Sequence, residues 1–203
     1  MEANRVLETL LHNSTIVRTE IARCPGELVR ALALRDGARL WMRPVRPDDE
    51  PRLVELFHRL SPRTVYQRFL APFHRLPAHW YHQFANVDYR TRLALVAEDP
   101  ATGGRPLRAV ARYEPGGAPG RAEVAMVVED AWQNRRLGTQ LLDALLDAAE
   151  ARGIHRFTAD LLAENRRMLR VLWRLAEIRR RELDRGVLTV EFERRRGVEG
   201  LLA

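Results

Sequence analysis

The sequence predicts a mixed α/β (α+β) domain whose central sheet is mostly antiparallel and flanked by helices. Two observations carry this prediction. Three strand-like runs, at residues 91–99, 105–115 and 121–130, are separated only by turns rich in glycine and proline, which is typical of an antiparallel meander. A helical pattern, a strand, a second helical pattern and a hairpin come next, and this alternation indicates that further strands join the same sheet.

The elements before the meander are less regular. Residues 40–45 are predicted to form a short strand, and residues 46–60 a helix with apolar side chains at helical spacing. Asp48 stands where a helix N-cap is expected. Earlier in the chain, residues 28–34 fit one face of a helix only loosely. Val6, Leu7, Leu10 and Leu11 fit a helical face better.

The elements after the meander alternate regularly and have short connections. They are a helix at 138–152, a strand at 156–163, a helix at 165–177, and a hairpin at 178–193 that turns at 184–186. We therefore expect one domain at 39–193, an N-terminal extension at 1–38 and a basic C-terminal tail at 194–203.

Composition indicates a single cytoplasmic domain. The chain has 203 residues, and none of its apolar runs approaches the ~20 residues that a membrane-spanning helix needs. Its first residues do not match a signal peptide, so we expect a cytoplasmic location and no membrane partner. Cys24 is the only cysteine, which rules out a disulfide within the chain and a thiolate metal cluster.

The formal net charge is +7, and every basic side chain apart from histidine is an arginine, because the sequence contains no lysine. One explanation is a nucleic-acid partner, and the other is arginine-rich codon usage. The arginines are scattered among acidic residues and are not interleaved with aromatic ones, so we regard nucleic-acid binding as unlikely.

The segment EDAWQNRRLGTQLL, at residues 129–142, leads from the last strand of the meander into a helix. Backbone N–H groups at a helix start lack partners and, together with the helix dipole, attract anions. Arg135 and Arg136 add positive charge, Gly138 allows a close approach of the backbone, and Thr139 adds a hydroxyl. These features predict a phosphate-binding loop, although the arginines could also be merely solvated.

The order of elements from Leu40 to Glu193, together with this loop, resembles the GNAT superfamily of N-acetyltransferases. That family has the pattern Gln/Arg-x-x-Gly-x-Gly/Ala, which Gln133 and Gly138 match and from which Arg136 departs. The phrases RPVRPDDEPRL, LSPRTVYQRFL and VDYRTRLALVAED resemble more narrowly the acetyltransferase domain of bacterial Pat-type protein lysine acetyltransferases. The resemblance implies that the pyrophosphate of acetyl-CoA is bound by Gln133, Asn134, Arg135, Arg136, Leu137, Gly138 and Thr139.

Glu123 is the predicted catalytic base, because it begins an apolar strand where burial would raise its pKa, and because the resemblance implies that role. The alternative for Glu123 is a surface position on an edge strand. The resemblance further implies that the backbone of Met126, Val127 and Val128 aligns the pantetheine and that Asn165 contacts the cofactor. Asn165 would also serve as a helix N-cap.

Two further departures from the family pattern concern the second half of the domain. Leu172 stands where many members have a tyrosine that protonates the leaving thiolate, so we assign no general acid. Ala176-Glu177 replaces the family's Gly-Phe. We expect no metal, because His74, His79 and His82 are better explained as surface or substrate-groove side chains.

The sequence thus predicts an acetyl-CoA-dependent N-acetyltransferase whose acceptor is a protein lysine. Two alternatives stay open: an acetyltransferase of a small-molecule amine, and a non-catalytic acyl-CoA-binding regulatory domain. The departures at Arg136, Leu172 and Ala176-Glu177 would favour the regulatory domain. The oligomeric state cannot be predicted, and a dimer is possible.

Overall fold

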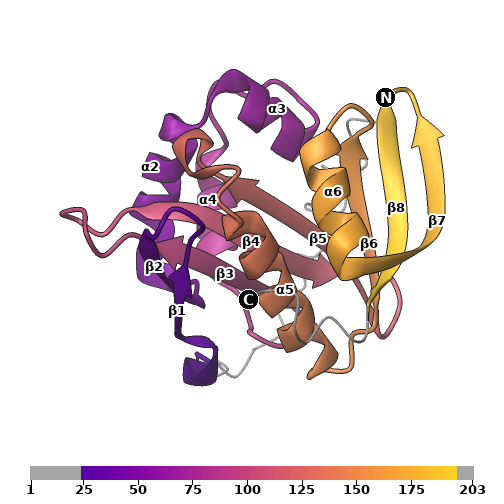
Figure 1. The fold of residues 1–203 in the computed structure, drawn as a ribbon, viewed down its shortest axis with the longest axis horizontal. Coiled ribbons are helices and arrows are strands. Elements are labelled where there is room, and N and C mark those ends of the chain that lie inside the picture. The colour runs from indigo at the N-terminus through magenta and orange to yellow at the C-terminus, as the bar shows by residue number, and fades with distance from the viewer. Residues whose placement is uncertain (1–23, 196–203) are drawn as a thin grey trace.

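The computed structural model describes residues 24–195 and confirms the predicted fold class. One sheet of eight strands runs through the molecule in the order β1-β2-β3-β4-β5-β6-β8-β7 (Figure 1). All neighbouring strands are antiparallel except β5 and β6. Within the described residues, no helix is both long and apolar enough to cross a membrane.

The strands are β1 (Arg30–Ala33), β2 (Arg39–Pro44), β3 (Leu93–Glu98), β4 (Leu107–Pro115), β5 (Arg121–Val128), β6 (Arg156–Leu162), β7 (Ala176–Asp184) and β8 (Val187–Arg194). The α-helices are α2 (Glu50–Arg59), α3 (Pro62–Phe69), α4 (Ala78–Ala85), α5 (Leu137–Glu150) and α6 (Arg166–Leu175). Short 3₁₀ turns precede α2 and α5, at Pro47–Asp49 and Asp130–Trp132.

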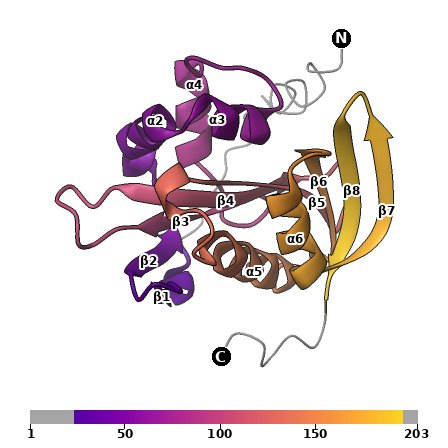
Figure 2. The same cartoon turned by 45° about the horizontal axis from the view of Figure 1, so that its top comes forward.

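Helices cover both faces of the sheet, which therefore forms the middle of three layers. Figure 2 shows α2, α3 and α4 on one side of the sheet and α5 with α6 on the other. All six residues of β3 are buried, and they alternate between the two cores: Leu95 packs on the α5 side and Val96 on the α2–α4 side. Burial on both faces explains why this strand is continuously apolar.

The meander and the final hairpin are confirmed. Strands β3, β4 and β5 pair in sequence order, and β7 turns into β8 between Asp184 and Val187. The chain then leaves β5 through α5 and returns as the parallel strand β6. This crossover places the start of α5 at the end of β5, where the predicted phosphate loop lies.

Two expectations for secondary structure were wrong. Residues 30–33 of the loosely helical segment form β1, which pairs with β2 through Arg30 and Met42, so the sheet includes part of the N-terminal segment 1–38. The second helix ends at Leu175 and not at Glu177, because residues 176 and 177 pair with β8. The helical face expected at Val6–Leu11 lies outside the described residues, as does the tail beyond Arg195.

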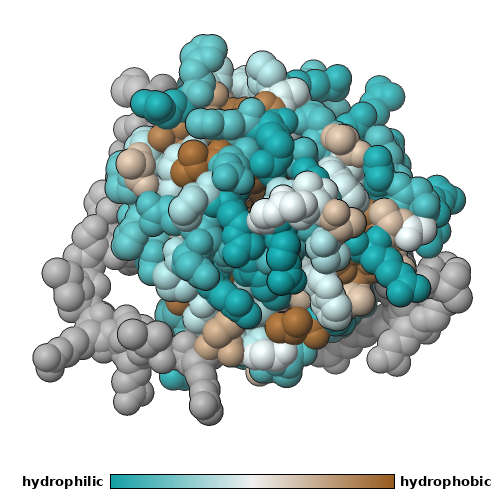
Figure 3. All heavy atoms as spheres, turned by 90° about the vertical axis from the view of Figure 1, so that its left-hand side faces the viewer, coloured by the Kyte–Doolittle hydropathy of each residue, from teal (hydrophilic) through white to brown (hydrophobic). Residues whose placement is uncertain are grey.

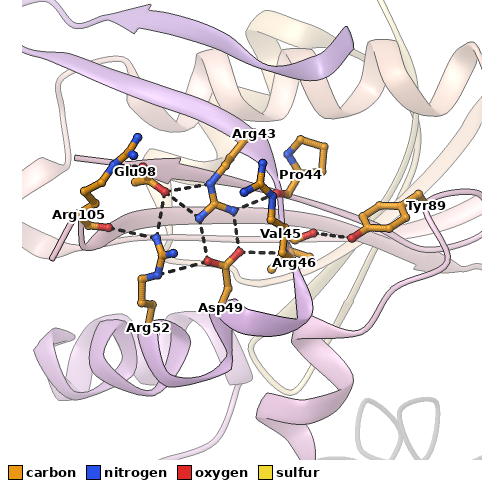
Figure 4. Close-up of polar contacts among 9 residues, drawn as sticks. All are labelled: Arg43, Pro44, Val45, Arg46, Asp49, Arg52, Tyr89, Glu98 and Arg105. Carbon is orange, nitrogen blue, oxygen red and sulfur yellow. Dashed lines mark hydrogen bonds and ion pairs between the residues drawn. The ribbon is translucent and has the colours of Figure 1, made fainter. Parts of the chain in front are cut away.

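A buried ion cluster fastens α2 to the sheet (Figure 4). Arg43, on β2, donates hydrogen bonds to both carboxylate oxygens of Asp49, at 2.6 and 2.7 Å, and to Glu98 of β3 at 2.9 Å. The three residues are 5%, 0% and 3% exposed. Arg52 of α2 and Arg105 add ion pairs to Glu98 at 3.0 and 2.6 Å.

The same cluster corrects the expected helix cap. Asp48 is exposed, whereas the buried carboxylate of Asp49 accepts the backbone N–H of Arg46 at 2.8 Å. Asp49 therefore both closes the turn before α2 and neutralises Arg43. Nearby, the Tyr89 hydroxyl donates to the carbonyl of Val45 at 2.9 Å, which ties the loop before β3 to the end of β2.

The face of the molecule on the left of Figure 1 is mostly hydrophilic. Figure 3 shows that its apolar side chains appear as separate small patches among polar ones. This pattern is ordinary for a protein surface and gives no sign of a docking site on that face.

Candidate active site

A cleft opens where β5 and β6 diverge. Their parallel ladder contains only three residue pairs, which end at Glu123 and Thr158. Beyond that point the cleft, of about 330 Å³, is lined by Val124–Val128 of β5 and by Ala159–Leu161 of β6. Backbone groups of a strand point alternately to its two sides, so those of β5 that face away from β4 have no strand partner here. An extended ligand could occupy this position.

The loop after β5 lies at the mouth of the cleft and has an unusual backbone. Asn134 and Arg136 have φ values of 63° and 67°, in the left-handed region that non-glycine residues rarely adopt. Arg136 precedes the first residue of α5, and the N–H groups of Leu137, Gly138 and Thr139 have no acceptor among the described residues. The loop therefore presents backbone donors that suit an anion at a helix N-terminus.

Close packing, and not a positive φ, favours glycine at position 138. A Cβ atom at this position would lie 3.1 Å from Cε of Met126 and 3.4 Å from Cγ2 of Val128. Its absence lets the start of α5 pack directly against β5. The helix N-terminus is thus held close to the strand that lines the cleft.

Gln133 connects three elements around the cleft. Its side-chain amide donates to the carbonyl of Val128 at 3.0 Å and to the hydroxyl of Thr64, on α3, at 3.2 Å, and its oxygen accepts a hydrogen bond from Arg167 of α6. Asp130 strengthens the link to α3 by accepting hydrogen bonds from Ser61 and Thr64. Because both amide N–H donors of Gln133 are used, this side chain shapes the loop more than it offers donors to a ligand.

The structure brings together all but one of the predicted site residues. Glu123, Met126, Val127, Val128, Gln133, Asn134, Arg136, Leu137, Gly138, Thr139 and Asn165 line the cleft. Arg135 does not, because its guanidinium forms an ion pair with Asp36 at 2.7 Å and lies over the ring of Trp132. Its contribution is to fasten the loop to the turn after β1.

Glu123 lies at the inner end of the cleft, at the last β5–β6 pair. Burial raises the pKa of its carboxyl above the usual range, and the negative charges of Asp160 and Glu114 raise it further, while Arg68 partly opposes them. A half-buried carboxylate with a raised pKa that faces a cleft has the properties of a general base. Glu123 pairs with Thr158 of β6, so it does not lie on an edge strand.

Asn165 caps α6 as expected, since its side chain accepts the N–H of Met168 at 3.2 Å. Leu172 is fully buried in the core and does not reach the cleft. All four tyrosines of the chain belong to the described part, and none of them lines this cleft. The cleft therefore has no tyrosine that could protonate the leaving thiolate, either at position 172 or from another part of the chain.

Several arginines in the cleft were not predicted. Arg167, Arg170 and Arg174 extend from one face of α6, and Arg68 enters from α3 opposite Glu123. The spacing of the three α6 residues, on the face opposite the apolar one, could have indicated them. No pattern in the sequence distinguishes Arg68 from the many exposed arginines.

The histidines predicted as surface or substrate-groove side chains do not line the cleft. His82 pairs with Glu50 at 3.2 Å, and the ring of His79 packs edge-on against Trp80. In residues 24–195, no three histidine, cysteine, aspartate or glutamate side chains come together as metal ligands would. Cys24 is exposed.

Comparisons with known proteins agree on the family. The family model described as "Acetyltransferase (GNAT) domain" matches residues 39–176. Acetyltransferase Pat of Mycolicibacterium smegmatis is 34% identical over 162 residues, which are 79% of this chain and 47% of the relative. This chain therefore matches about half the length of that protein. Acetyltransferase PA5475 of Pseudomonas aeruginosa is 28% identical over 75% of this chain and 82% of its own.

The structural comparison leads to the same family. The crystal structure of the GNAT domain of S. lividans PAT superposes with a TM-score of 0.74 and 35% sequence identity. The match covers 83% of this chain and 98% of that domain. From the family model, the sequence relatives and this superposition, the chain belongs to the GNAT family of acetyltransferases.

Proposed function

We propose that this protein transfers the acetyl group of acetyl-CoA to lysine side chains of other proteins. The observation that supports this most is the position of Glu123, with its raised pKa, at the inner end of a cleft whose mouth carries an anion-binding loop. The family supports the acetyl-CoA donor. The resemblance to Pat proteins supports a protein acceptor, and we expect the reaction to take place in the cytoplasm.

In this proposal the cofactor follows the cleft from its mouth to its inner end. The pyrophosphate accepts hydrogen bonds from the N–H groups of Leu137, Gly138 and Thr139, with Arg136 beside it. The pantetheine arm lies along Met126–Val128, where β5 has no partner strand, and Asn165 approaches it from the other side. The thioester then lies near Glu123.

The chemistry needs a neutral amine, because a lysine ammonium has a pKa near ~10.4 and cannot attack. Glu123 takes one proton from it, directly or through water. The amine nitrogen bonds to the thioester carbonyl carbon, the carbon–sulfur bond breaks, and CoA leaves as a thiolate. The second proton that the nitrogen loses passes to this thiolate or to water. Thiols with a pKa near ~8.5 leave as thiolates without a strong acid, so a buried leucine at position 172 is compatible with turnover.

Arg136 should affect cofactor binding and stability in opposite directions. Arg136→Gly removes the strain of a left-handed arginine and is expected to raise the free energy of unfolding by roughly 1 kcal/mol. It also removes a guanidinium from the cleft, so acetyl-CoA should bind more weakly, and the loss should be larger at low salt. Calorimetric titration at two salt concentrations, with thermal unfolding of the free proteins, measures both effects. Tighter binding by the variant would show that strain or steric blocking dominates at this position.

The function is tested by incubating the protein with labelled acetyl-CoA and either a panel of lysine-containing proteins or small amines. We expect label on protein lysines. The protein itself contributes no background signal in this assay, because it has no lysine side chain that could be acetylated. Mass spectrometry should therefore find acetyl-lysine only on the added proteins.

The alternatives give different results in the same assay. Label on small amines but on no protein would favour a small-molecule acetyltransferase. Acetyl-CoA binding without transfer to any acceptor would favour the regulatory domain. Absence of acetyl-CoA binding at millimolar concentration would overturn the proposed function altogether.

A further inference from the structure

A second, smaller cavity lies on the α2–α4 side of β5. Its volume is about 50 Å³, and it shares Arg68, Ala125 and Val127 with the wall of the main cleft. Its other walls are mostly apolar, with side chains from α2, α3, α4 and β4. A space of this size accommodates a few non-hydrogen atoms but no peptide, since one water molecule needs about 10–15 Å³ of it.

Polar groups on its wall lack acceptors. Tyr81 is 5% exposed, and its hydroxyl lies near the backbone of Leu76 but forms no hydrogen bond with any described residue. The guanidinium of Arg68 lies 4.9 Å from the ring centroid of Phe69 and has no hydrogen-bond acceptor or ion-pair partner in residues 24–195. An unpaired hydroxyl in a buried place is unfavourable, and the half-buried guanidinium of Arg68 is free to pair with a ligand.

A second arginine adds to the positive charge of this cavity. Arg112 of β4 stacks on Phe84, at 4.5 Å, and pairs with Glu114. Burial and the charge of Arg112 together lower the pKa of Arg68 to about 10, against the opposing effect of the carboxylates of Glu123 and Glu114, so Arg68 remains a cation at neutral pH. A small anion between the cleft and this cavity would give Arg68 an acceptor and reduce the repulsion between the two arginines.

The place of the cavity indicates which part of a substrate would carry that anion. It adjoins β5 at Ala125 and Val127, beside the strand along which the pantetheine lies in the proposed function. The group next to the thioester is the acyl chain. We propose, given that function, that the cavity is a subsite for short acyl groups ending in a carboxylate, with Arg68 and Tyr81 as donors to that carboxylate.

Malonyl is the smallest such acyl group, since it adds one carboxylate to acetyl. The transfer step is unchanged: the amine nitrogen bonds to the thioester carbonyl carbon, the carbon–sulfur bond breaks, and Glu123 holds the proton removed from the amine. The distal carboxylate is not consumed and needs no further reactant. Its only role is to determine which acyl-CoA binds.

The test compares the affinities for malonyl-CoA and acetyl-CoA, measured by calorimetry on the full chain. The wild type should bind malonyl-CoA at least as tightly as acetyl-CoA. Arg68→Gln should lower the ratio of malonyl-CoA to acetyl-CoA affinity by ~10-fold or more, because a charge-assisted hydrogen bond is lost. Arg63→Gln, an exposed position on the same helix that lines neither cavity, is the matched control for loss of one charge and should keep the wild-type ratio.

Tyr81→Phe is a second variant, with nearly unchanged volume, and should lower the same ratio a few-fold. If wild type binds acetyl-CoA but malonyl-CoA more than tenfold more weakly, the subsite is refuted while the proposed function stands. An unchanged ratio in both Arg68→Gln and Tyr81→Phe would refute it equally. If neither donor binds, the proposed function itself has failed.

Discussion

Glu123→Gln is expected to lower turnover by ~10²-fold or more near neutral pH while leaving acetyl-CoA affinity almost unchanged. The amide has nearly the same size and stays in the same half-buried place, but it cannot take a proton. The affinity is preserved because the anion site and the open edge of β5 do not depend on this side chain. Steady-state kinetics with a lysine-containing acceptor, together with calorimetry, separates the two effects.

The same role of Glu123 predicts the direction in which activity changes with pH. The base works only when ionised, and burial, with Asp160 and Glu114, raises the pKa of Glu123. In wild type, kcat/KM should therefore rise with pH through that raised pKa, and Glu123→Gln should remove this limb. Glu182→Gln, at an exposed carboxylate on β7, is the matched control and should retain the wild-type profile. Turnover by Glu123→Gln at the wild-type rate would exclude Glu123 as the base.

Asp49→Ala is expected to destabilise the fold by about 3 kcal/mol or more, because it leaves Arg43 buried without its bidentate partner. The loss also frees the backbone N–H of Arg46 and loosens the start of α2. Asp48→Ala is the adjacent control, and its effect should stay within about 0.5 kcal/mol because Asp48 is exposed. Urea unfolding of the three proteins measures the difference. Equal midpoints for the two variants would contradict the role given to the cluster.

The ion cluster should also affect stability at low pH. Burial by itself would raise the pKa of Asp49 and Glu98, but hydrogen bonds and charge from Arg43 outweigh it and hold both below their usual range. Their contribution is present above the unfolded pKa values, near ~3.9 and ~4.3, and is lost as pH falls through the lower folded values. Stability of wild type should therefore decline more steeply with acidification than that of Asp49→Ala.

Much of the fold could be predicted because its pattern is local. The meander, the crossover helix and the hairpin each carry their own periodicity and turn residues, and all three are confirmed. Strand β1 was missed because it has four residues and only one is buried, so it has no clear alternation. What makes it a strand is pairing with β2, which is a tertiary interaction.

In the candidate site, too, the features with a local sequence pattern could be predicted, and those set by tertiary contacts could not. The loop could be predicted since a glycine, polar residues and a helix start follow one another in the sequence, and Arg136 does have the positive φ that glycine would favour. The cap was predicted at Asp48 and lies at Asp49, because the sequence cannot show which of two adjacent carboxylates faces a buried arginine. Arg68 was missed for a similar reason, since lacking an acceptor is a property of its surroundings.

The divergence of β5 and β6 has a mechanical consequence. Three residue pairs join the strands β1–β5 to the strands β6–β8, and beyond them the connection depends on helix packing. The sheet is therefore weakly joined along this line, and its two parts can rotate relative to each other about the pairs that end at Glu123 and Thr158. A ligand that lies along β5 in the gap would bridge β5 and β6 and restrict this rotation. The unliganded protein is then the more deformable form, and its stiffness along this line depends on what it has bound.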